Sequence, residues 1–246
     1  MDVTDSRSFF LSSSHLAVLA VTAAVCVALP LTARDHPGPW TSVFSRGLAV
    51  LLFGVFLAYP LVIGLRGDYE LDFDLPLHLT DAVTVVAALA LWSRQPLLVE
   101  LTYFWGLTAS LQAVLTPALS EDDGPSTFLF WNYFITHSGV VLGALFLVIG
   151  LGLTPRRGAV GRVFLATAAW AAVAAIGNAL TGGNYMFLSE KPETASLLDY
   201  MGPWPWYIVS SALLALALFK LLDLPFRRRS RCPRFMGPAR RRRRSR

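Results

Sequence analysis

The sequence predicts an all-α fold, a polytopic membrane helical bundle with about seven transmembrane helices. Three observations point to this fold: 54% of the 246 residues are hydrophobic, only 15% are charged, and the apolar residues form seven long stretches. A soluble domain carries about 25% charged residues, whereas a stretch of about 20 apolar residues can cross a bilayer as a helix. We therefore expect a multi-pass protein of the cell membrane.

The seven predicted spans follow one another with short connections. They cover residues 13–32, 45–65, 75–92, 97–115, 128–151, 159–180 and 203–222. Pro76 and Pro203 fall in the first turns of their spans, where the missing N–H costs nothing. Asp2 and Asp5 precede the first span and favour a retained helix over a cleaved signal peptide.

The basic residues predict the orientation of the bundle. Eighteen of the 21 Lys and Arg residues fall on one side of the predicted spans, and eleven of them lie in the tail after residue 226. The other side carries the acidic loops. Because cytoplasmic loops are enriched in Lys and Arg, the sequence predicts an extracytoplasmic N-terminus at 1–12 and an Arg-rich, disordered cytoplasmic tail at 223–246.

The tail and the cysteines limit the expected partners and cofactors. Anionic lipid headgroups would attract the tail arginines. The Arg-rich stretch 227–246 has a single aromatic residue, Phe235, to stack on bases, so no nucleic acid is expected. Cys26 and Cys232 form neither a disulfide framework nor a metal-binding spacing. We expect no cofactor and no metal, with membrane lipids as the surroundings and a possible substrate.

Polar residues gather near the extracytoplasmic ends of four spans, where a membrane helix rarely carries them without a use. Two of these spans enter the membrane there and two leave it. The residues are His78, Thr80 and Asp81 on the third span, Ser110 and Gln112 on the fourth, Asn132 and His137 on the fifth, and Asn178 on the sixth.

Each of these residues also has a structural interpretation. Thr80 could bond to the carbonyl four residues before it, and His137 could join two helices. His78 and Asp81 share a helix face and could neutralise each other. Glu100, near the cytoplasmic end of the fourth span, could reach the interface or pair with Arg94.

The chemistry open to this set is limited. His137 could act as a general base on the Thr80 hydroxyl for acyl transfer, and Gln112, Asn132 or Asn178 could stabilise an oxyanion. Asp81 could instead serve a proton-coupled transporter. A metal site at His78 and Asp81 is a further alternative, although their spacing alone is weak evidence.

Several segments together resemble a known family, the YwaF-like bacterial integral membrane proteins, which have long been of unknown function. The resemblance covers residues 40 to 226. The segments are 75–81 (LPLHLTD), 100–106 (ELTYFWG), 111–117 (LQAVLTP), 134–137 (FITH), 184–188 (NYMFL) and 197–206 (LLDYMGPWPW).

The resemblance implies an activity on lipids. The family is similar to a human transmembrane acyltransferase that remodels ether phospholipids with a Cys and a His, and more distantly to androgen-induced membrane hydrolases that use Thr and His on fatty-acid esters. His137 matches the His. Many YwaF-like sequences carry Cys where this chain has Thr80, a departure that favours the Thr/His hydrolase pattern or a loss of catalysis.

Our leading hypothesis is an intramembrane lipid-acyl hydrolase or acyltransferase with Thr80 as nucleophile and His137 as base. His78 and Asp81 would tune the site, and Gln112, Asn132 and Asn178 would line it. The alternative is a non-enzymatic protein, centred on Asp81, that binds or transports a lipid or small solute. A scaffold whose polar residues only fasten helices together is a third possibility.

Overall fold

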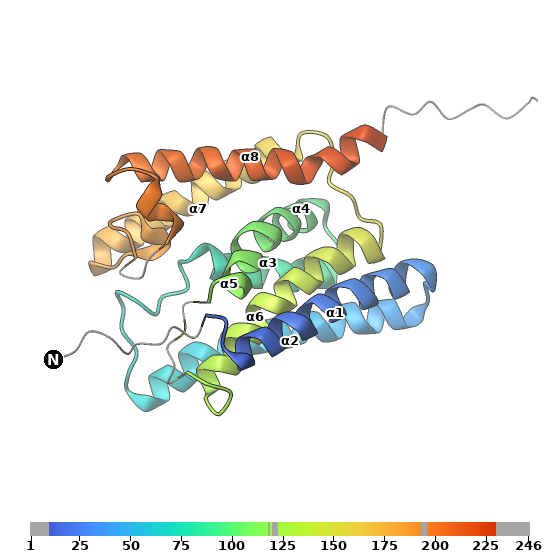
Figure 1. The fold of residues 1–246 in the computed structure, drawn as a ribbon, viewed down its shortest axis with the longest axis horizontal. Coiled ribbons are helices and arrows are strands. Elements are labelled where there is room, and N and C mark those ends of the chain that lie inside the picture. Colours follow the sequence, from blue (N-terminus) through green and yellow to red (C-terminus); the bar gives the residue numbers. More distant parts are fainter. Residues whose placement is uncertain (1–9, 118, 120–122, 193–195, 230–246) are drawn as a thin grey trace, which may run out of the picture.

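The structure is a computed structural model that describes residues 10–117, 119, 123–192 and 196–229, and all regular secondary structure in these ranges is helical (Figure 1). A π-helical segment, Gly106–Ser110, joins α4 to α5, and a second one, Phe146–Gly150, extends α6. The helices are α1 (Ser13–Asp35), α2 (Pro39–Arg66), α3 (Leu79–Ser93), α4 (Pro96–Trp105), α5 (Leu111–Leu115), α6 (Phe128–Leu145), α7 (Ala159–Thr181) and α8 (Trp206–Arg229). The predicted all-α fold is confirmed.

Six of the helical segments in the described ranges are long and apolar enough to cross a membrane, with α4, its π-helical segment and α5 acting as one span. The third predicted span corresponds to α3, which has 15 residues and is shorter than the other six. Residues 1–9 and 230–246 lie outside the described residues, and with them most of the predicted N-terminal segment and the Arg-rich tail.

Prolines explain where the observed helices differ from the predicted spans. Pro39, after the extended Gly38, starts α2 six residues earlier than expected. Pro76 and Pro203 were predicted in first helical turns, and both lie before their helices begin. A residue that precedes proline is driven toward extended backbone, so α3 starts only at Leu79 and α8 only after Pro205.

Helices α3, α4 and α6 form the centre of the bundle. Figure 1 shows α1 and α2 on one side of them and the α7–α8 pair on the other, where α7 packs on α4. Glycines allow close packing at this centre. Gly139 faces Leu52, and the side chain of Leu91 lies 3.2 Å from the position that a Cβ of Gly143 would take. Small residues at helix contacts are typical of membrane bundles.

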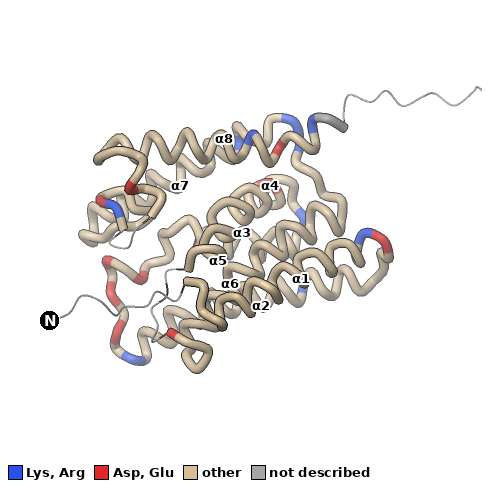
Figure 2. The backbone as a smooth tube through the Cα atoms, viewed as in Figure 1, with Lys and Arg blue, Asp and Glu red and all other residues tan. Residues whose placement is uncertain are grey.

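Charged residues separate toward the two ends of the bundle. In Figure 2 most Lys and Arg residues lie at the end where α1 turns into α2, and most Asp and Glu residues lie at the opposite end, on the loops after α2 and α7. This separation is the pattern on which the predicted orientation rests. The orientation itself stays a prediction.

A buried carboxylate closes the basic end of the bundle. Glu100 is 1% exposed and accepts hydrogen bonds from Arg156 at 2.8 Å and from Arg162 at 2.8 Å. The predicted pairing of Glu100 with Arg94 is wrong, since Arg94 donates to Ser42 instead. The hydrogen bond to Glu100 raises the pKa of the Arg156 guanidinium.

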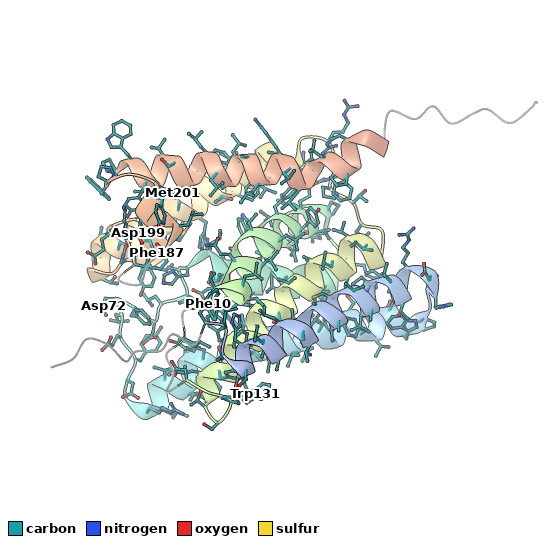
Figure 3. All side chains as sticks on the ribbon, in the orientation of Figure 1. Phe10, Asp72, Trp131, Phe187, Asp199 and Met201 are labelled. Carbon is teal, nitrogen blue, oxygen red and sulfur yellow. The ribbon has the colours of Figure 1, made fainter. Side chains whose placement is uncertain are left out.

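At the opposite end, the loop after α2 and the loop after α7 hold each other. The Tyr185 hydroxyl donates to the carbonyl of Leu71 at 2.8 Å and accepts from the backbone N–H of Leu75 at 3.0 Å. Burial raises the pKa of this hydroxyl, which keeps it a donor. Asp72, Phe187 and Asp199 lie at this end of the molecule (Figure 3).

Candidate functional site

His137 lies on α6 and is 8% exposed. Its ring meets the ring of Tyr133, one turn earlier on the same helix, edge-on with centroids 4.3 Å apart. In the described part of the chain its Nδ1 has no hydrogen-bond partner. A buried ring nitrogen without a partner costs about 1–3 kcal/mol, so this imidazole is available to another polar group.

His15 and His78 differ from His137 in the hydrogen bonds of their rings. His15 is fully buried, yet its Nδ1 accepts from the backbone N–H of Leu11 and its Nε2 lies 2.9 Å from the carbonyl of Val114. The Nδ1 of His78 accepts from the backbone N–H of Met186 at 3.3 Å. Both residues therefore have structural hydrogen bonds that occupy ring nitrogens, whereas His137 keeps one free.

Thr80 is the second residue of α3, which packs on α6, and it is half-buried. Its carbonyl accepts from the Thr84 hydroxyl at 2.8 Å. No hydrogen bond joins the Thr80 hydroxyl to His137 among the described residues. Nor, in the described chain, does the Thr80 hydroxyl donate to the carbonyl four residues before it, the bond expected in the structural interpretation.

The register of α3 against α6 shows how far apart the two residues lie along the bundle axis. Leu91 meets Gly143, and from that contact Thr80 lies about 16.5 Å up α3 while His137 lies about 9 Å up α6. Because helical side chains lean toward the helix N-terminus, the imidazole extends toward Thr80, and its contact with Tyr133 agrees with this direction. The offset between the two Cα levels is about 7.5 Å, and the imidazole extends into it while the shorter Thr80 side chain leans the other way.

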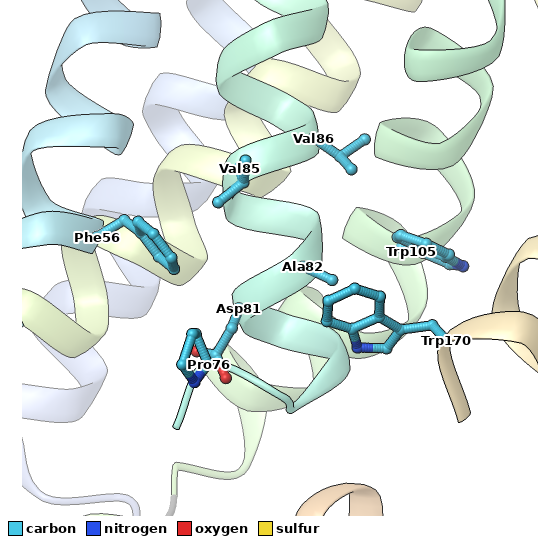
Figure 4. Close-up of a pocket in the computed structure, with 8 residues that line it drawn as sticks. All are labelled: Phe56, Pro76, Asp81, Ala82, Val85, Val86, Trp105 and Trp170. Carbon is cyan, nitrogen blue, oxygen red and sulfur yellow. The ribbon is translucent and has the colours of Figure 1, made fainter. Parts of the chain in front are cut away.

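Asp81 lines a cavity of about 270 Å³ between α2, α3, α4 and α7 (Figure 4). One carboxylate oxygen accepts from the backbone N–H of His78 at 3.0 Å and caps α3. Rings of Phe56, Trp105 and Trp170 line the same cavity. No Lys or Arg in the described ranges forms an ion pair with this carboxylate. The expected contact between the side chains of His78 and Asp81 is replaced by a bond from the His78 backbone, while the His78 ring accepts from Met186.

The remaining predicted lining residues have structural partners or face outward. Asn132 donates to the carbonyl of Val55 at 3.0 Å and joins α6 to α2. Asn178 both donates to and accepts from the backbone of Tyr185, which fixes the loop after α7. Gln112 is exposed on the surface of the bundle. These three predicted residues thus have a fastening role or an exposed position, and His137, Thr80 and Asp81 remain as candidates for chemistry.

Sequence reasoning gave no role to Ser110, whose side chain is fully buried and whose hydroxyl has no hydrogen-bond partner in the described part of the chain. It ends the π-helical segment after α4, and π-helical turns occur often at functional sites. The only sequence signal was its place beside Gln112 among the polar residues of the fourth span.

Metal binding has no geometric support in the described ranges, because no group of three or more His, Cys, Asp or Glu side chains is arranged to hold an ion. His78 and Asp81 are joined through the backbone N–H of His78, and in the described part of the chain they belong to no such group.

The fold and the buried polar residues define a multi-pass α-helical membrane protein. The model of the TMEM164 family matches residues 10–223, and the chain belongs to this family. The matched region contains Thr80, Ser110 and His137.

One relative is an uncharacterized protein of Treponema pallidum (strain Nichols). It is 31% identical over 157 residues, which make up 63% of this chain and 63% of the relative. The matched part of this chain thus spans less than two thirds of the relative's length. No solved structure matches the chain.

Proposed function

We propose that this protein is an intramembrane enzyme that cleaves or transfers the acyl chains of lipid esters, with Thr80 as the nucleophile and His137 as the general base. The observation that carries the proposal is the free Nδ1 of a buried imidazole on a helix that packs against the helix bearing Thr80. The distant similarity of the YwaF-like family to membrane hydrolases that use Thr and His is in keeping with these roles.

The position of Thr80 in α3 favours a reactive hydroxyl. It lies in the first turn of the helix, where the helix dipole stabilises negative charge by about 0.3–1 kcal/mol. Charge that develops on the Thr80 oxygen as it loses its proton would be stabilised in the same way. Asp81, the next residue, already caps this turn and holds its backbone in place.

The reaction would proceed in two acyl-transfer steps. In the first, the Thr80 oxygen forms a bond to the ester carbonyl carbon while its proton passes to His137, and the lipid alkoxide leaves with that proton. In the second, a hydroxyl attacks the acyl-Thr80 ester, its proton passes to His137, and Thr80 recovers a proton as its bond to the acyl group breaks. Water as the second hydroxyl gives hydrolysis, and a lipid alcohol gives transfer.

Labelling with a fluorophosphonate probe, together with turnover of a fluorogenic oleoyl ester, tests this proposal on purified protein in detergent. We expect Thr80→Ala to abolish labelling and His137→Ala to lower turnover by about 10²–10⁴-fold, the usual contribution of a general base. Thr102→Ala is the matched control, since it removes a buried hydroxyl that only donates to Leu98. Unchanged turnover in the Thr80 and His137 variants would contradict the proposal.

We infer a second candidate function from the Asp81 cavity, the binding or transport of an organic cation. A carboxylate without a Lys or Arg partner in the described chain lies beside three aromatic rings, a combination that attracts quaternary ammonium groups. The indole N–H groups of Trp105 and Trp170 are already bonded to Thr167 and Leu77. Their rings are thereby held in place along the cavity.

Uptake of labelled choline into proteoliposomes separates this second function from the first. Asp81→Asn keeps an oxygen that can cap α3 but removes the charge, so it should abolish uptake, whereas Thr80→Ala should leave it unchanged. Asp223→Asn is a control for loss of a carboxylate elsewhere, because Asp223 pairs with Arg227. Equal uptake by wild type and Asp81→Asn would exclude a role for this carboxylate.

A further inference from the structure

Ser110 combines full burial with a hydroxyl that has no hydrogen-bond partner in the described chain. Several Thr and Ser side chains in or at the ends of the helices of the bundle donate to the carbonyl four residues earlier, as membrane-helix hydroxyls commonly do. Those that do so are Thr84, Ser93, Thr102, Thr108, Thr116, Thr167, Thr181 and Ser211. Ser110 makes no such bond in the described chain although its side chain is fully buried.

Two contacts place Ser110 opposite His137. On one side, the Tyr133 hydroxyl donates to the carbonyl of Ala113 at 2.9 Å. On the other, Gly106 packs against Val140, whose Cγ1 lies 3.2 Å from the position of a Cβ on that glycine. Residue 110 falls between 106 and 113 on one helix, and residue 137 falls between 133 and 140 on the other.

The same spacing puts these residues on facing surfaces. Positions three or four residues apart share one face of an α-helix, so 133, 137 and 140 share a face. In the π-helical segment a turn is wider, with hydrogen bonds that span five residues, and 110 still lies about one turn after 106 and one turn before 113. The two faces are the ones in contact, since the π-helical segment packs directly on α6. Ser110 Oγ and His137 Nδ1 are therefore two free, buried polar atoms on one helix contact.

We propose that Ser110 and His137 together bind the hydroxyl group that accepts the acyl chain. The Ser110 hydroxyl donates to the oxygen of the bound hydroxyl, and that hydroxyl donates to His137 Nδ1. Only a group that both accepts and donates satisfies the pair in this way. The assignment rests on the proposed acyl-transfer function and adds the site of its second step, in which His137 Nδ1 takes the proton of the attacking hydroxyl.

The chemistry fits two sources of the hydroxyl, a lipid alcohol and water. ¹⁵N-histidine NMR in detergent distinguishes them without any turnover, because the Nδ1 resonance responds to hydrogen bonding. His137→Asn assigns the signal. Ser110→Ala should fold as wild type, since it removes a hydroxyl with no partner in the described protein. Thr108→Ala, in the same π-helical segment, removes a hydroxyl already bonded to Phe104 and is the matched control.

Oleyl alcohol is the probe, as it carries a hydroxyl but no ester. A lipid alcohol site predicts that it shifts the wild-type His137 signal and that Ser110→Ala weakens the affinity about tenfold, the effect of one lost hydrogen bond. A water site predicts no effect of the alcohol but a different signal in Ser110→Ala than in wild type and Thr108→Ala. A His137 signal that neither oleyl alcohol nor Ser110→Ala changes overturns the inference.

The two failures can be told apart. If oleyl alcohol binds through Ser110 but Thr80→Ala retains full esterase activity, the hydroxyl site stands and the proposed nucleophile falls. If Thr80→Ala is inactive and Ser110→Ala leaves the His137 signal, the KM for the alcohol acceptor and kcat unchanged, the hydroxyl site falls and the nucleophile stands.

Discussion

Tyr133 and His137 are joined edge to face on α6, with ring centroids 4.3 Å apart. The tyrosine is itself held from the far side, because its hydroxyl donates to the carbonyl of Ala113 on α5. The rotamer of the imidazole is thus coupled to the spacing between α5 and α6. A base held in this way is positioned before any ligand arrives.

Tyr133→Phe should keep the ring contact with His137 and lose the hydrogen bond to Ala113. We expect the free energy of unfolding to fall by about 1 kcal/mol, the net value of a hydrogen bond of this kind. Denaturant titration in detergent measures this change. Tyr133→Ala, which also removes the ring, should cost more stability, and equal losses in the two variants would show that the hydroxyl alone matters.

Thr80→Cys should produce an active enzyme whose nucleophile is a thiol. Cys is the stronger nucleophile near neutral pH, so activity toward an oleoyl ester should be retained or rise, and a thiol-directed reagent should then inhibit it. The wild-type protein is the control for reaction at the native cysteines, Cys26, which is buried, and Cys232, which lies outside the described residues. Thr80→Val keeps the shape without the hydroxyl, and significant turnover by this variant would contradict the assigned nucleophile.

Glu100→Gln should destabilise the basic end of the bundle without affecting the chemistry at the other end. The side chains of Arg156 and Arg162 are 50% and 37% exposed, so both can return to water, and we expect a loss of about 2 kcal/mol. Thermal unfolding measures it. Asp223→Asn, which removes a pair between residues four apart, should cost under about 1 kcal/mol, and a larger loss there than at Glu100 would reverse this order.

Gly183→Ala should loosen the contact between the loops after α2 and α7, because its Cβ would collide with the backbone carbonyl of Asp72. Overpacking of this kind costs about 1–3 kcal/mol. Hydrogen exchange should then rise at Leu75, whose N–H is bonded to Tyr185. Gly47→Ala on α2 meets open space and should stabilise its helix by about 0.5–1 kcal/mol, so equal effects would contradict the account.

The helices could be predicted because their signals are local. Apolar stretches gave α7 at 159–180 against an observed Ala159–Thr181, where Gly182 in the left-handed region ends the helix. The start of α2 was missed because the Gly38-Pro39 signal lies in polar sequence outside the apolar stretch. Helix α8 continues through Pro225 to Arg229, beyond the predicted end at 222, and apolarity alone did not predict this extension.

The site could be predicted only in part, because its partners are distant in sequence. His137 and Thr80 stood out as polar residues inside apolar spans. The partners of Glu100 lie 56 and 62 residues away in the sequence, whereas the prediction considered only near neighbours and therefore gave Arg94. For Ser110 the sequence offered only its place beside Gln112, because whether a buried hydroxyl finds a partner depends on the packing of helices that are distant in sequence.

Mass spectrometry of the acylated protein tests the central proposal most directly. Purified protein is mixed with p-nitrophenyl oleate, quenched in acid and digested, and the peptide that contains residue 80 is examined. The account predicts an oleoyl group on Thr80 in the wild type and little or none in His137→Ala. An unmodified Thr80 in wild-type protein that turns over the ester, or an acyl group on another residue, would contradict it.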